Sequence, residues 1–111
     1  MRTHNACRLR IYCDDTDAHE GQPFYRWLVE AAHRRGLRGA TVMHGMMGFG
    51  GHSEIHSSKV FALAADLPVV IEIIDSREKI YDFVTEFEAD LQKGLATVED
   101  VDTAFFAGNS D

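Results

Sequence analysis

The chain has 111 residues, of which 45% are hydrophobic and 26% are charged, and its formal net charge is −7. These values predict one globular domain with its own hydrophobic core, and they exclude a largely disordered chain. The negative charge argues against nucleic acid as a partner, because proteins that bind it through phosphate contacts usually have a basic face.

The cysteines and the first residues of the chain indicate a cytoplasmic protein. Cys7 and Cys13 would lie about 20 Å apart in one strand, too far for a disulfide, so a reducing compartment fits best. Residues 1–6 are polar, and no apolar segment of a signal peptide follows them. The longest apolar stretch, residues 67–74, is too short to cross a membrane.

The first half of the chain predicts a strand, a helix and a second strand. Side chains alternate over residues 6–13, which is typical of a strand. A polar loop over residues 14–22 follows, and then Pro23 suits the first turn of a helix and Gly36 suits its end. Residues 40–47 are apolar and partly β-branched, which indicates the second strand. The apolar stripe of the helix has helical spacing: Phe24, Trp27, Leu28, Ala31 and Ala32.

The second half predicts a loop, a strand, a helix and a last extended segment. The loop is rich in glycine and polar residues over 48–59, and the short apolar segment 60–64 is compatible with a strand. Residues 69–74 are the clearest predicted strand of the chain. Residues 95–106 form the last extended segment.

The second helix is expected between those two strands. Asp75 and Glu78 resemble a capping box at its start, and Gly94 follows its end. Its apolar stripe consists of Ile80, Phe83, Val84, Phe87 and Leu91.

This order of elements, βαββαβ, predicts an α+β domain with the ferredoxin-like split βαβ fold. In that fold an antiparallel sheet has both helices on one face. The single domain would span residues 1–111, with a core over about 6–106 and loose termini at 1–5 and 107–111.

The face of the sheet without helices is expected to be an interface between copies of the chain. Val70, Glu72 and Ile74 point to it and are mostly apolar, although an uncovered face of an antiparallel sheet is usually polar. A large apolar face of this kind marks an interaction surface. Arg8 and Arg10 would join it, and one of them would pair with Glu72. Alternatively, Glu72 lies at an edge and reaches solvent.

The segment from Gly45 to Lys59 is the most unusual part of the chain. Glycines let backbone N–H groups approach a phosphate, and Ser57 and Lys59 could complete such a site. The alternative is a hairpin loop that needs glycine for its turns. Catalysis is not expected, because Cys7 and Cys13 face the core and no nucleophile motif is present.

Two sets of histidines and acidic residues could bind a metal ion. His44, His52 and His56 could form a divalent-metal site, although polar loop histidines are the simpler interpretation. A cation could also bind the acidic run of Asp14, Asp15, Asp17 and Glu20, which otherwise indicates a solvated loop. Phe49, Phe105 and Phe106 could stack on a base, although aromatic residues more often pack in a core or an interface.

Five segments in order resemble one family, the PII-like group known as domain of unknown function 190. The resemblance covers residues 8–101, nearly the whole chain. The segments are 9–12 (LRIY), 20–25 (EGQPFY), 39–42 (GATV), 45–50 (GMMGFG) with 56–59 (HSSK), and 66–75 (DLPVVIEIID).

The resemblance implies a ferredoxin-like PII-like homotrimer with nucleotides bound in clefts between subunits, next to the loop 48–59. A signalling or sensor protein that responds to AMP or ADP is therefore expected, because residues 93–97 offer one lysine for a triphosphate. The family also implies a membrane transport partner, such as a fluoride channel. The alternative is a divalent-metal-binding trimer of the cation-tolerance type. The expected ligand-binding residues are Gly45, Gly48, Phe49, Gly50, His52, His56, Ser57 and Lys59.

Overall fold

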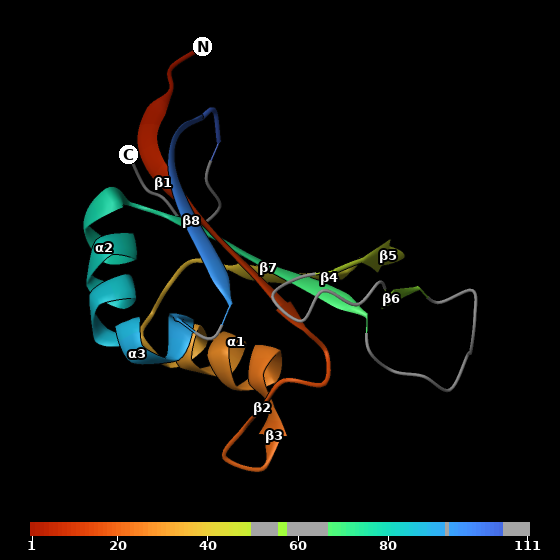
Figure 1. Cartoon of the computed structure of the whole chain (residues 1–111). Helices are drawn as coiled ribbons and strands as arrows, with labels where there is room; N and C mark the ends of the chain where they lie inside the picture. Colours follow the sequence, from red (N-terminus) through yellow and green to blue (C-terminus); the bar gives the residue numbers. More distant parts are fainter. Residues whose placement is uncertain (50–55, 58–66, 93, 106–111) are drawn as a thin grey trace.

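The computed structural model describes residues 1–49, 56–57, 67–92 and 94–105. Its main sheet is antiparallel, with the strand order β4-β7-β1-β8 (Figure 1). The strands are β1 (His4–Asp14), β4 (Ala40–His44), β7 (Pro68–Asp75) and β8 (Leu95–Thr103). Strands β1 and β4 run parallel with β7 between them, which is the split βαβ arrangement predicted from the sequence.

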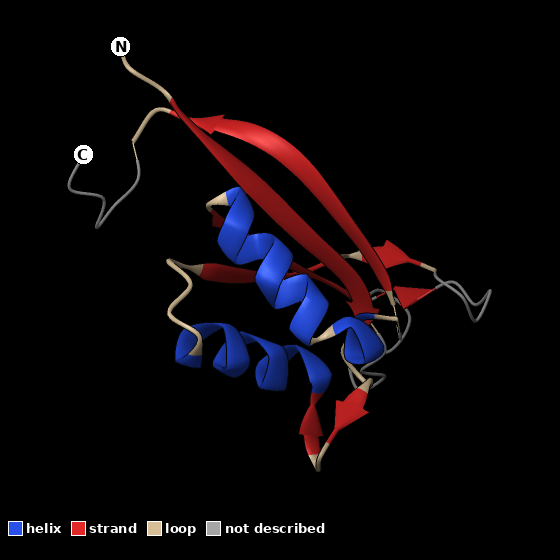
Figure 2. Ribbon diagram, turned by 90° about the vertical axis from the view of Figure 1, so that its left-hand side faces the viewer, coloured by secondary structure: helices blue, strands red, loops and turns tan. Residues whose placement is uncertain are grey.

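Both main helices cover the same face of this sheet (Figure 2). They are α1 (Phe24–Arg34) and α2 (Arg77–Glu86), and the short α3 (Glu88–Leu91) follows α2. Two small hairpins add β2 (Ala18–His19) with β3 (Gln22–Pro23), and β5 (Met47–Gly48) with β6 (His56–Ser57). The chain therefore has the predicted α+β, ferredoxin-like fold.

The core lies between the helices and one side of the central strands. In β7, Val69, Ile71 and Ile73 are fully buried, whereas the residues between them keep part of their exposure. This alternation is the strand periodicity seen in the sequence. The same side of β1 and the helical segments supply the rest of the core: Cys7, Leu9, Ile11, Phe24, Leu28, Ala31, Ala32, Ile80, Phe83, Phe87 and Leu91.

Gly36 directly follows the C-cap of helix α1, as predicted. The φ of Gly36 is +76°, a left-handed conformation that glycine adopts without steric cost, and its N–H donates to the carbonyl of His33 at 3.1 Å. The N–H of Arg35 donates to the carbonyl of Ala31 at 3.0 Å. These bonds satisfy carbonyl groups of the last helical turn.

The predicted capping box of Asp75 and Glu78 is wrong. Ser76 is the N-cap of α2, and its Oγ accepts a hydrogen bond from the N–H of Lys79 at 3.3 Å. Asp75 is instead the last residue of β7, and its buried carboxylate accepts from the N–H groups of Ser76 at 2.7 Å and Arg38 at 3.0 Å. A buried carboxylate needs such donors, so Asp75 ties the sheet to the α1–β4 connection.

Two element boundaries also differ from the expectation. The stripe expected to form one helix up to Leu91 is divided into α2 and α3 at Phe87, whose ring packs 4.7 Å from that of Phe83. Strand β1 begins at His4, so two residues expected in a loose terminus pair with β8. The apolar segment 60–64 lies outside the described residues.

Candidate functional site

The uncovered face of the sheet has an apolar row across all four strands. The register places Met43 beside Val70, Val70 beside Tyr12, and Tyr12 beside Leu95. Three of these side chains are exposed: Met43 by 43%, Tyr12 by 39% and Leu95 by 60%. We call these four residues the apolar row. Burying such a row in a partner would be favourable, because each Å² of apolar surface removed from water contributes about 25 cal/mol.

A charged row lies next to the apolar row on the same face. Arg10 and Glu72 are register neighbours, and Arg10 Nε donates to Glu72 Oε2 at 2.8 Å, so the sequence-based Arg–Glu pairing forms within one chain. This hydrogen bond raises the pKa of the Arg10 guanidinium above its usual value. Arg8 forms an ion pair with Glu99 on the neighbouring strand β8. The predicted interface residues therefore share one face, where Ile74 lies beside Arg8.

The loop between β4 and β7 leaves and rejoins the sheet at a tightly packed site that we call the neck, formed by Gly45, Gly48 and Pro68. The N–H of Gly45 donates to the carbonyl of Pro68 at 2.8 Å. A Cβ atom at Gly45 would lie 2.7 Å from Pro68 Cγ, and one at Gly48 would lie 3.2 Å from it. Two glycines predicted to bind a ligand thus have a packing role, since the neck leaves little room for a side chain at Gly45.

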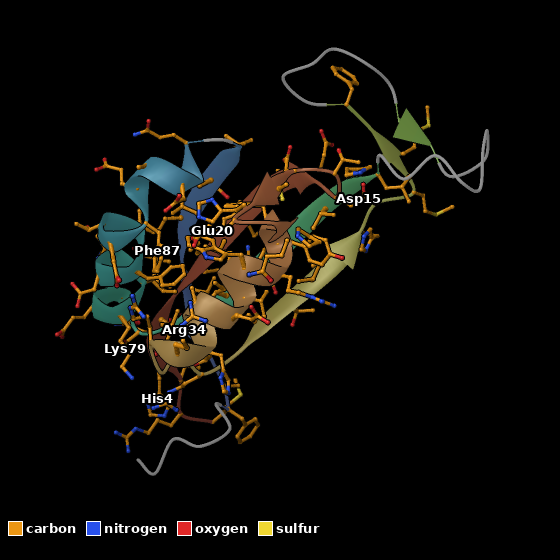
Figure 3. All side chains as sticks on the ribbon, turned by 90° about the horizontal axis from the view of Figure 1, so that it is seen from below. His4, Asp15, Glu20, Arg34, Lys79 and Phe87 are labelled. Atoms are coloured by element: carbon orange, nitrogen blue, oxygen red, sulfur yellow. The ribbon has the colours of Figure 1, made fainter. Side chains whose placement is uncertain are left out.

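Asp15 brings the turn after β1 into this neck (Figure 3). Its N–H donates to the carbonyl of Leu67 at 3.0 Å, and its Oδ1 accepts from the N–H of Leu67 at 3.1 Å. Its Oδ2 lies 3.8 Å from Nε2 of His44, the last residue of β4. The ring of Tyr25 on α1 meets the His44 ring edge-on, with centroids 5.8 Å apart.

The structure describes part of the predicted ligand-binding set. Phe49 is 69% exposed directly after β5. His56 and Ser57 form β6 and pair with Gly48 and Met47, respectively. The remaining members of the set, Gly50, His52 and Lys59, lie outside the described residues.

Sequence reasoning placed Val70 on this face but missed the other three members of the apolar row and the role of Asp15. The alternation over residues 6–13 already placed Tyr12 with Arg8 and Arg10, so that signal was available. No local pattern indicates that Leu95 or Met43 lies in the same row, because strand register depends on contacts distant in sequence.

Among the described residues, no group of three or more His, Cys, Asp or Glu side chains could hold a metal ion. His44 faces Asp15 and Tyr25, while His52, another member of the proposed metal set, is not described. The acidic run uses its oxygens within the chain: Asp17 Oδ2 accepts from the N–H of Asp14 at 2.9 Å. The described part of that run therefore forms a hydrogen-bonded turn.

The thiols are not suited to nucleophilic chemistry. Burial, with the charges of nearby aspartates, raises the pKa of Cys13 to about 12, and burial also raises the pKa of Cys7. Both cysteines are free, as the strand spacing predicted. A thiol with so high a pKa forms little thiolate at neutral pH. In the described part of the chain, no helix is long and apolar enough to span a membrane.

Comparisons with known proteins identify the relatives of this chain. A curated UPF0166 protein of Aquifex aeolicus is 44% identical over 105 residues, which cover 95% of this chain and 99% of that protein. A UPF0166 protein of Methanocaldococcus jannaschii is 32% identical over 93 residues, covering 83% of this chain and 85% of that protein.

A solved structure with a similar fold is CPII from Thiomonas intermedia, a nitrogen regulatory PII-like protein bound to ADP, AMP and bicarbonate. The TM-score is 0.70 at 17% identity, and the match covers 94% of this chain and 92% of CPII. At that identity the likeness shows the fold. The family model of DUF190, described as Uncharacterized ACR, matches residues 6–103, and the chain therefore belongs to this family.

Proposed function

We propose that this protein is a PII-like regulator that assembles as a homotrimer in the cytoplasm and binds AMP or ADP between its subunits. The proposal has support from the DUF190 match and from the fold shared with CPII, which was solved with ADP and AMP. The two free cysteines fit a reducing compartment.

The observation that carries the proposal is the position of the apolar row beside the neck of the β4–β7 loop. Met43 belongs to the row and immediately precedes His44, where the chain leaves the sheet. A second copy that covers the apolar row therefore also approaches the neck. The ligand would lie in the cleft formed there, so that binding and assembly depend on the same end of the sheet.

Different loop residues would contact the phosphate and the adenine of the nucleotide. Backbone N–H groups that follow Gly45, whose own N–H donates to Pro68, would hold the phosphate with Ser57 and Lys59, and His52 or His56 would add a contact. The ring of Phe49, which is exposed directly after β5, would stack on the adenine. Ligand-dependent ordering of such a loop is a common way to transmit a signal to a partner, and we propose a membrane transport protein as that partner.

Calorimetry with AMP, ADP, ATP and cyclic AMP tests this function. We expect saturable binding of AMP or ADP and recovery of the nucleotide unchanged, as for a sensor rather than an enzyme. Light scattering of the same samples should give the mass of three chains. No heat or thermal shift with any of these nucleotides would contradict the nucleotide proposal. Copper or zinc binding instead would favour the metal-binding alternative.

Exposed phenylalanines provide a matched pair of variants. Phe49→Ala should weaken nucleotide binding by about 1–3 kcal/mol, the usual contribution of an aromatic ring stacked on a base. Phe105→Ala removes a ring that is 90% exposed and more distant in sequence from the neck, and it should leave the affinity unchanged. Equal effects of the two changes would contradict the assignment of Phe49.

A further inference from the structure

Asp15 contacts the end of the β4–β7 loop twice. Its backbone N–H donates to the carbonyl of Leu67 at 3.0 Å, and its carboxylate Oδ1 accepts from the N–H of Leu67 at 3.1 Å. Leu67 directly precedes Pro68, the first residue of β7. Because the backbone and the side chain of one residue both hold Leu67, the place where the loop rejoins the sheet is fixed to the turn after β1.

The other oxygen of the same carboxylate faces the start of the loop. Asp15 Oδ2 lies 3.8 Å from Nε2 of His44, and Gly45 follows with a hydrogen bond to the carbonyl of Pro68. The Asp15 side chain is only 13% exposed, which limits screening by solvent, whereas that of His44 is 45% exposed. A single carboxylate therefore faces both ends of the loop.

The contacts continue from the neck to a helix. The His44 ring meets the ring of Tyr25 edge-on, and Tyr25 belongs to α1 and packs against the hydrophobic core. Asp17, in the same acidic turn as Asp15, instead accepts from the N–H of Asp14 at 2.9 Å. Among the described residues, Asp15 is thus the acidic side chain whose contacts join both loop ends.

We infer that Asp15 is a positioning residue that fixes Leu67 and His44, at the two ends of the loop, against the turn after β1 and so preorganises the ligand site. The inference rests on the proposed nucleotide-binding function for its effect on affinity. The pairing of β4 with β7 already brings the loop ends side by side, and Asp15 adds a restraint on Leu67 next to that pair. A restraint that is already present in the free chain lowers the entropic cost of binding, so the affinity rises.

The variants Asp15→Ala and Asp15→Asn separate the two contacts of the side chain. Asp15→Ala removes both, and we expect about tenfold weaker AMP or ADP binding, the loss typical of one hydrogen bond to a charged group. Asp15→Asn keeps an oxygen for the N–H of Leu67 but removes the charge facing His44, so its loss should be smaller. Asp17→Asn is the matched control in the same turn and should bind like the wild type.

Hydrogen exchange of the Leu67 amide is the second measurement, and it does not depend on a nucleotide. We expect this amide to exchange faster in Asp15→Ala and to remain protected in Asp17→Asn. Thermal melting shows whether each variant is folded. If Asp15→Ala does not fold, the affinity of Asp15→Asn is compared with that of the double variant Asp15→Asn, His44→Gln. We expect the His44 change to weaken binding little further, because the charge that faces His44 is already absent in Asp15→Asn.

The results distinguish the positioning role from the proposed function. Weaker binding together with faster Leu67 exchange supports the role of Asp15. Unchanged affinity in Asp15→Ala would overturn preorganisation, and unchanged exchange would overturn the clamp itself. If the wild type binds none of the nucleotides, the proposed function and the affinity effect fail together, while Leu67 exchange still decides whether Asp15 holds the loop end.

Discussion

The two faces of the main sheet have similar side chains but different surroundings. In β7, the covered face has Val69, Ile71 and Ile73, and the uncovered face has Val70 and Ile74 on either side of Glu72. The helices exclude water completely from the first set, whereas the second set remains partly exposed in the single chain. An apolar pattern in a strand therefore does not by itself show which face the helices of the same chain cover.

The polar groups of the two faces also differ in burial and in their partners. The covered face has one buried carboxylate among the described residues, Asp75, and backbone N–H groups satisfy it. The uncovered face has ion pairs between neighbouring strands, such as that of Arg10 with Glu72. A charged pair next to the apolar row favours a surface that stays in contact with water, because taking an ion pair out of water costs desolvation free energy.

The largest expected effect on the stability of the chain is on the covered face. Ile71→Ala should lower the free energy of unfolding by about 2–5 kcal/mol, because it leaves a cavity beneath the helices. Denaturant unfolding measures this loss. Val70→Ala, one residue away on the other face, should cost less at low protein concentration. Equal losses at the two positions would contradict the distinction between the faces.

Asp75→Ala tests the contribution of the buried carboxylate on the covered face. The change leaves the N–H groups of Arg38 and Ser76 without their acceptor, and we expect a loss of about 1–3 kcal/mol in the free energy of unfolding. Asp100→Ala is the control, since that carboxylate is 71% exposed and pairs with Arg77 at the surface. A loss in the control as large as in Asp75→Ala would show that burial does not explain the effect.

Val70→Asp should have the smallest effect on the single chain and the clearest effect on assembly. Its side chain points to the uncovered face, so the folded chain should lose less than about 1 kcal/mol, as for most surface changes. A charge in the middle of the apolar row should nevertheless separate the proposed trimer into single chains. Light scattering gives the mass, and Val70→Ile serves as the control. A trimer that persists in Val70→Asp would contradict the use of this face.

Most of the fold could be predicted from local patterns. The alternation in residues 69–74, the helical stripe after Pro23 and the position of Gly36 were confirmed. These patterns depend on neighbours two to four residues apart, so the sequence contains all the information they need. The helix boundary at Ser76 was missed, because Asp75 also suits an N-cap and its burial cannot be seen locally.

Less of the candidate site could be predicted. The neck was recognised as unusual from its glycines, but the reason for Gly45 is its close approach to Pro68, a residue distant in sequence whose Cγ would lie 2.7 Å from a Cβ atom at that position. The acidic turn was interpreted as a solvated loop or a cation site. Neither interpretation anticipates that Asp15 holds Leu67, because the hydrogen bond spans 52 residues of sequence.

The sequence by itself determined the elements, their order and which residues of each strand share a face. The tertiary structure alone decided the register of the strands and the contacts of the loop ends, and so brought Met43, Val70, Tyr12 and Leu95 into one row and Asp15 to both ends of the loop. The physical reason is that periodicity arises from backbone geometry within a few residues. Register and long-range hydrogen bonds arise from the packing of the whole chain.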